Sequence, residues 1–162
     1  MMHSIAAEVL QVLQGRKARL VLAESCTGGL VAATLTEISG ASASLCGSFV
    51  TYTNEAKREW IGVPESMIEI HTEVSPEVAV AMVHGALDRT PSASVAASIT
   101  GHLGPGAPPA LDGRGYIATC VDGELRVENF HLAAKDREAR QREAADSVLR
   151  RISGHLAASN ER

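Results

Sequence analysis

Short apolar stretches alternate with amphipathic ones along the first hundred residues, and this alternation constrains the fold more than any other feature. Residues 19–24 (RLVLAE), 45–53 and 93–100 are short and rich in apolar or β-prone side chains, which is typical of buried strands. Helical patterns precede, separate and follow these strands, and are predicted over residues 3–15, 27–38, 54–60, 75–88 and 136–156. Strands that alternate with helices in this way indicate helices on both faces of a sheet.

A hairpin is predicted late in the chain. Asp122 and Gly123 form a strong turn signal between two β-prone segments, residues 114–121 and 124–132. A late antiparallel hairpin added to early parallel strands makes the sheet mixed. The expected fold is therefore an α/β protein, a three-layer α/β/α sandwich with a mixed β-sheet. The 162 residues contain no repeat and no linker composition, so a single domain is expected.

Composition excludes several classes of function. The net charge is −4 and aromatic residues make up 3% of the chain, so the sequence offers neither a basic footprint nor stacking surfaces for nucleic acid. No stretch approaches the roughly 18 apolar residues of a membrane span. The three cysteines are an odd number without a CxxC spacing, which favours free thiols in a reducing compartment. The N-terminal pattern is not that of a signal peptide, so the expected location is cytoplasmic, with no membrane and no nucleic-acid partner.

The first candidate site is the segment ESCTGG at residues 24–29, which joins a predicted strand to a predicted helix. Open α/β sheets bind ligands beyond the carboxyl ends of their strands, and free N–H groups at a helix start attract anions. A hydroxyl at Ser25 would lie in that positive potential. Cys26 is a second candidate nucleophile, because thiol pKa values fall at helix starts. The alternative is structural: Ser25 and Thr27 merely cap the helix, and the glycines fit a tight turn.

The second candidate site is YTNEAK, which ends at Lys57. If Asn54 caps the helix, Lys57 lies near its positive end, where the helix dipole and partial burial both lower the pKa of an amine. A neutral amine near pH 7 can act as a general base. The alternative is a solvated surface lysine, which is how Lys17 and Lys135 are interpreted. Tyr52 either donates a hydrogen bond to the substrate or to Lys57, or packs as an ordinary strand residue.

Two further features are weaker. The loop that begins TGHLGPG at Thr100 can wrap a ligand with backbone amides, or it can be a flexible connection. Arg137 and Arg140 are spaced i, i+3 on the last helix, so they can reach a phosphate together or form a solvated face. The HExxH motif is absent and the six histidines show no ligand spacing, so no metal site is predicted.

The segments LAESCTGG, YTNEAKREW and SITGHLGPG together resemble the CinA C-terminal-domain family. That family includes nicotinamide mononucleotide deamidase, an amidohydrolase. The resemblance covers roughly residues 5–152, and it implies one CinA C-terminal-like domain over residues 1–162. The longer CinA proteins carry an additional N-terminal domain, and this chain resembles the stand-alone form.

The resemblance implies hydrolysis of the carboxamide of nicotinamide mononucleotide to the acid, with release of ammonia and without metal or cofactor. Ser25 would be the nucleophile, Lys57 its base and Tyr52 an assisting residue. The residues that would bind the substrate, its oxyanion or its phosphate are Thr27, Gly28, Gly29, Thr100, Gly101, Arg137 and Arg140. A homodimer is also expected from the family.

One stretch departs from the family pattern. The family loop usually continues GPGGG…KPVGTV, whereas this chain reads GPGAPPALDGRGYI, with Asp112-Gly113-Arg114 in place of Lys-Pro-Val. His102-Leu103 also replaces the usual Ile-Ala. An acid in place of a base at the rim of the site allows a different substrate. It also leaves open a non-catalytic nucleotide-binding or regulatory module of the same fold.

Overall fold

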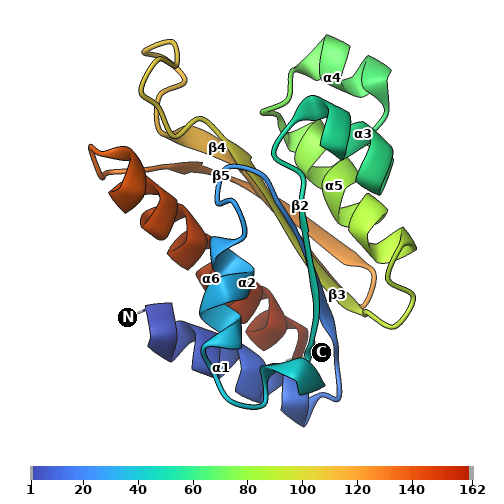
Figure 1. The fold of residues 1–162 in the computed structure, drawn as a ribbon. Coiled ribbons are helices and arrows are strands. Elements are labelled where there is room, and N and C mark those ends of the chain that lie inside the picture. The colour runs from blue at the N-terminus through green and yellow to red at the C-terminus, as the bar shows by residue number, and fades with distance from the viewer. Residues whose placement is uncertain (1, 161–162) are drawn as a thin grey trace.

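The computed structural model describes residues 2–160, in which five strands form one sheet between two layers of helices (Figure 1). The strands are β1 (Leu20–Glu24), β2 (Leu45–Val50), β3 (Val95–Gly101), β4 (Arg114–Val121) and β5 (Glu124–His131). Their order across the sheet is β2-β1-β3-β4-β5. The expected three-layer α/β/α sandwich is therefore confirmed.

The sheet is mixed, as the sequence predicted. Strand β1 pairs in parallel with both β2 and β3, whereas β3 with β4 and β4 with β5 are antiparallel. The predicted turn joins β4 to β5, with φ of 49° at Asp122 and 86° at Gly123. Two successive positive φ angles fit the twist of a two-residue hairpin. Because β1, β2 and β3 are parallel, their carboxyl ends meet at one edge of the sheet.

The helices divide between the two faces of the sheet (Figure 1). Helices α1 (Met2–Gly15), α2 (Leu30–Thr36) and α6 (Arg137–Asn160) cover one face, and α3 (Asn54–Ile61), α4 (Glu65–His71) and α5 (Pro76–Asp88) lie on the other. A short 3-10 helix, η1 (Ala41–Ala43), precedes β2. The strands alternate their side chains between two cores: Leu20 and Leu22 face the α6 side, whereas Val21 and Ala23 face the α5 side. A strand buried on both faces favours apolar side chains on both, which explains the run LVLA, and only the last residue of β1, Glu24, is charged.

Several helix boundaries differ from the prediction. Helix α2 begins at Leu30 after Gly29, and Thr27 does not cap it. Helix α3 is capped by Thr53, whose hydroxyl accepts from the N–H of Ala56, rather than by Asn54. The cap of α3 thus lies one residue before the predicted position, and α2 has no side-chain cap at Gly29. Ser75 caps α5 as predicted, with its hydroxyl accepting from the N–H of Val78.

Helix α4, the projecting loop and the cysteines complete the description of the fold. Helix α4 was not predicted, because none of its seven residues is fully buried and they carry no clear periodicity. The segment 102–113 is the predicted loop, and it projects from the sheet opposite α4 (Figure 1). All three cysteines are free, and Cys46 is only partly buried, unlike Cys26 and Cys120. Within residues 2–160, no helix combines the length and the apolar character that crossing a bilayer requires.

Candidate active site

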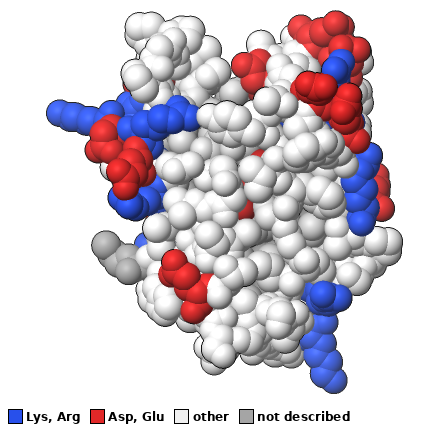
Figure 2. Space-filling model, in the orientation of Figure 1, with Lys and Arg blue, Asp and Glu red and all other residues white. Residues whose placement is uncertain are grey.

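A cavity of about 530 Å³ opens at the edge where the carboxyl ends of β1, β2 and β3 meet. Its walls come from the turn after β1, from the start of α3, from the segment before α5 and from the projecting loop. Figure 2 shows a hollow between that loop and the α3–α4 side, and most of the surface in the middle of this face is uncharged. This is the position at which open α/β sheets bind ligands.

Ser25 lies in the floor of this cavity. Its N–H donates to the carbonyl of Ile99 at 3.1 Å, which continues the β1–β3 pairing one residue beyond the strand. The hydroxyl is therefore held by the sheet rather than by a free loop. Ser25 is 7% exposed, so it is reached only from the cavity.

Lys57 contacts Ser25. The Lys57 Nζ lies 3.0 Å from Ser25 Oγ and 3.2 Å from the carbonyl oxygen of Thr51. Thr51 follows β2, and its N–H donates to the carbonyl of Glu24, so the ends of β1 and β2 are joined where the two side chains meet. The interpretation of Lys57 as a solvated surface residue is wrong, because the side chain is only 1% exposed.

Burial lowers the pKa of Lys57 below its ordinary value of 10.5, and electrostatic interactions with Cys26 and Glu73 oppose this effect. An ammonium in this position lacks water, so the neutral amine is favoured. The nitrogen of a neutral amine has a lone pair, and at 3.0 Å it can accept the proton of the serine hydroxyl. The pair has the geometry of a nucleophile beside its base.

Cys26 also lines the cavity, but burial raises the pKa of its thiol to about 12. The thiol therefore stays protonated, and the hypothesis that Cys26 is the nucleophile is not favoured. The backbone N–H of Thr27 has no acceptor within residues 2–160, and that of Cys26 interacts only with its own thiol among those residues. Because both N–H groups directly follow Ser25, they are available to the oxyanion that forms on a substrate carbonyl when the hydroxyl attacks it.

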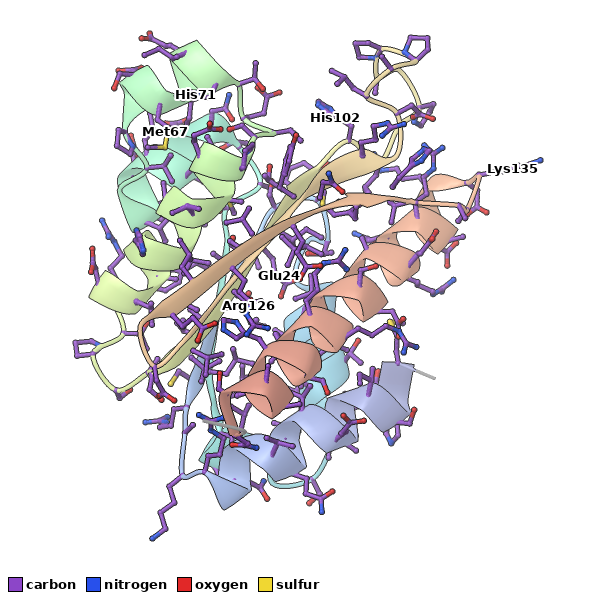
Figure 3. All side chains as sticks on the ribbon, turned by 180° about the vertical axis from the view of Figure 1, so that it is seen from behind. Glu24, Met67, His71, His102, Arg126 and Lys135 are labelled. Atoms are coloured by element: carbon purple, nitrogen blue, oxygen red, sulfur yellow. The ribbon has the colours of Figure 1, made fainter. Side chains whose placement is uncertain are left out.

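Glu24 has a role that the sequence analysis missed. Its carboxylate is 1% exposed and accepts hydrogen bonds from Thr27 Oγ1, Ser48 Oγ and the N–H groups of Gly29, Val31 and Ala32, at 2.8–3.1 Å. Figure 3 labels Glu24 inside the molecule. Glu24 thus does at the start of α2 what a capping residue normally does. The signal in the sequence was an acid at the end of an apolar strand, just before a helix whose own N-cap is glycine.

Arg137 crosses the mouth of the cavity. Its guanidinium donates to Tyr52 Oη at 2.8 Å and to the carbonyl of Gly104 in the projecting loop. The hydroxyl of Tyr52 therefore contacts Arg137 from α6 rather than Lys57, and its side chain is 57% exposed. Thr100 and Gly101 also line the cavity, and the Thr100 hydroxyl donates to the carbonyl of Glu73.

Four predicted binding residues lie outside the cavity lining. Arg140 makes a two-point ion pair with Asp112, at 2.8 and 2.7 Å, and also donates to the carbonyls of Leu103 and Ala134. Arg140 thus fastens both ends of the projecting loop to α6, and its charge is neutralised by the acid that departs from the family pattern. The others are Thr27, Gly28 and Gly29, which build the turn below the cavity.

The other two lysines lie outside the cavity. Lys17 and Lys135 are exposed, and Figure 3 shows Lys135 pointing into solvent. Among residues 2–160, no group of three or more His, Cys, Asp or Glu side chains is placed to hold a metal ion.

Known proteins share both the sequence and the fold. The family model described as "CinA C-terminal domain" matches residues 2–156. A "CinA-like protein" of Myxococcus xanthus is 38% identical over 160 residues, which are 97% of this chain and 38% of the relative. A second, from Citrifermentans bemidjiense, is 46% identical over 115 residues, or 70% of this chain and 28% of the relative. The chain thus spans well under half the length of these curated relatives.

Solved structures match almost from end to end. A CinA superfamily protein of Klebsiella pneumoniae superposes with a TM-score of 0.92 at 28% identity, covering 98% of this chain and 99% of the other. The competence/damage inducible protein CihA of Agrobacterium tumefaciens gives a TM-score of 0.90 at 33% identity, covering 96% and 95%. On this evidence the chain belongs to the CinA C-terminal domain family.

Proposed function

We propose that this protein is an amidohydrolase that uses Ser25 and Lys57 to hydrolyse the carboxamide of a pyridine nucleotide to the acid and ammonia. The observation that carries the proposal is the 3.0 Å contact between the serine hydroxyl and a lysine amine that is almost wholly buried. The resemblance to a family that includes nicotinamide mononucleotide deamidase supports the choice of substrate.

In the proposed reaction, neutral Lys57 takes the proton of Ser25 as Oγ attacks the carboxamide carbon. The N–H groups of Cys26 and Thr27 donate to the oxyanion of the tetrahedral intermediate. The Lys57 ammonium then returns the proton to the amide nitrogen, the C–N bond breaks, and ammonia leaves. Lys57 next takes a proton from water, the hydroxide attacks the acyl-enzyme ester, and the acid is released as Ser25 regains its proton.

The outer cavity fits the remainder of such a substrate. Arg137 spans the mouth, where its guanidinium contacts neutral oxygens and no carboxylate among residues 2–160. A guanidinium with neutral partners can exchange them for a phosphate, which it binds through charge-assisted hydrogen bonds. Arg140 does not join it, because Asp112 already occupies that guanidinium.

The test is ammonia release from nicotinamide mononucleotide by the purified protein, with the acid product followed by chromatography. Release of both products in equal amounts supports the proposal. If this compound is inert, a screen of other amide-bearing nucleotides decides between a changed substrate and a binding module without turnover. Tight binding of pyridine nucleotides with no hydrolysis of any amide would contradict the enzyme.

The proposed base predicts a pH profile. The pKa of Lys57 lies below 10.5 in the folded protein, and only the neutral amine accepts a proton, so kcat/KM is expected to rise with pH through that pKa and then level off. The measurement is kcat/KM from about pH 5 to about pH 10 at constant ionic strength. A flat profile, or a rise confined to the range in which carboxylates titrate, would contradict the role of Lys57.

A further inference from the structure

The cavity contains an acid that the proposed reaction does not use. Glu73 lies in the wall just before α5 and is half-buried. No ion pair or hydrogen bond to its carboxylate is found within residues 2–160. Its backbone is held firmly, since its carbonyl accepts from Thr100 Oγ1 at 2.7 Å and the preceding Thr72 has a φ of 67°, which is rare for a residue with a Cβ.

The charge of Glu73 acts at the reacting end of the cavity and opposes the chemistry there. It raises the pKa of Lys57, against the effect of burial, and so favours the ammonium that cannot act as a base. A half-buried carboxylate without a partner is also costly to the folded protein. Both costs disappear when a cation binds beside Glu73, because the cation pairs with the carboxylate and itself disfavours the ammonium.

Charges of opposite sign lie in the outer and inner parts of the cavity. Arg137 is bonded to the exposed Tyr52 and to the projecting loop, in the outer part. Glu73 is bonded through its carbonyl to Thr100, the residue after the Ile99 that accepts from the Ser25 N–H, so Glu73 lies in the inner part. A ligand that complements both ends carries a positive charge near its amide and a negative charge farther away. Among amides, an N-substituted pyridinium carboxamide has its positive charge in the ring that bears the carboxamide.

We propose that Glu73 is a specificity-determining residue that selects amides whose ring is a cation, the N-substituted pyridinium carboxamides, over uncharged rings of the same shape. The inference rests on the proposed function, because it assigns the ring to the space between Glu73 and the Ser25–Lys57 pair.

The test compares two probes that differ in ring charge. Nicotinamide mononucleotide has a pyridinium ring, and benzamide riboside 5′-monophosphate has the same carboxamide and phosphate on a neutral ring. The wild-type protein is expected to prefer the cation by about tenfold or more in kcat/KM. Glu73→Gln removes the charge at constant shape. With both probes measured on the level part of the pH profile, where Lys57 is already neutral, it should remove most of this preference by lowering kcat/KM for the cation alone. Equal activity of the wild type on both probes would overturn the inference.

Glu69→Gln is the matched control, because Glu69 is exposed on α4, outside the cavity lining, and the net charge changes equally. It should leave the preference intact. A second readout is the acid limb of the kcat/KM profile, which should move to lower pH in Glu73→Gln because the carboxylate no longer favours the Lys57 ammonium. Equal losses on both probes without this movement would mark Glu73 as a structural residue only.

A binding measurement separates this inference from the proposed function. Calorimetric titration of the Ser25→Ala protein with both probes, with and without Glu73→Gln, needs no turnover. A preference for the cation that Glu73→Gln removes supports the inference even if the parent releases no ammonia, in which case only the hydrolase proposal fails. The absence of any preference in binding would overturn the inference even in an active enzyme.

Discussion

Lys57→Met is expected to reduce amide hydrolysis by about a thousandfold or more while the protein stays folded. General bases contribute roughly 10² to 10⁴ in rate, and this amine is proposed to act in both halves of the reaction. Methionine is unbranched and of similar length, so it fills the buried path of the lysine without a charge. Because burying an amine is costly, the free energy of unfolding should not fall. Initial rates of ammonia release and urea unfolding curves measure the two effects.

Lys57→Arg tests whether a positive charge alone is enough at this position. Arginine keeps a positive charge that it cannot lose, so it cannot take the serine proton. It should be as inactive as Lys57→Met and less stable, because its guanidinium must enter a site that is 1% exposed. If positive charge were the only requirement at this position, Lys57→Arg would retain activity.

Ser25→Ala completes the set. Residues that act as one catalytic unit lose little more when both are replaced, so Ser25→Ala with Lys57→Met should be about as slow as either alone. Multiplicative losses would show that the two side chains act independently. A Lys57→Met protein within about tenfold of the parent would remove the proposed mechanism altogether.

The sequence predicted the parts of the fold that depend on local pattern. The strands, the hairpin at Asp122 and the cap at Ser75 each depend on neighbouring residues, and the structure has all of them. Helix α4 was missed because none of its seven residues is fully buried. The pairing of Arg140 with Asp112 was missed because the two residues are 28 positions apart, and only the folded loop brings them together.

The candidate site was predictable to a similar extent. Ser25 and Lys57 each follow a strand, and parallel strands end at one edge, so their proximity follows from topology. The near-complete burial of Lys57 does not, since it depends on how α3 packs over the strand ends. The role of Glu24 was hidden for a different reason. Hydrophobic patterning predicts which positions are buried, but it does not say which buried polar group receives the N–H groups of a distant turn.

Glu24→Ala is expected to lower the free energy of unfolding by about 3 to 5 kcal/mol. Its carboxylate accepts from three backbone N–H groups at the start of α2 and from two hydroxyls, in an interior where water cannot replace it. Removing it leaves these donors unsatisfied and opens a small cavity. Urea unfolding followed by circular dichroism measures the loss.

Glu24→Gln separates the charge from the shape. The amide keeps one acceptor oxygen, but its NH₂ group faces donors that need an acceptor, so a loss of about 2 to 3 kcal/mol is expected. Glu55→Gln is the control, because Glu55 lies exposed in the first turn of α3 and should change stability by less than about 0.5 kcal/mol. Both Glu24 variants should also lose activity at urea concentrations too low to unfold them. The reason is that Ser25 and the N–H groups of Cys26 and Thr27 follow Glu24 directly in the chain. A Glu24→Gln protein as stable and as active as the parent would mean that the hydroxyls and amides around this carboxylate find other partners, and that Glu24 does not hold the turn on which the nucleophile depends.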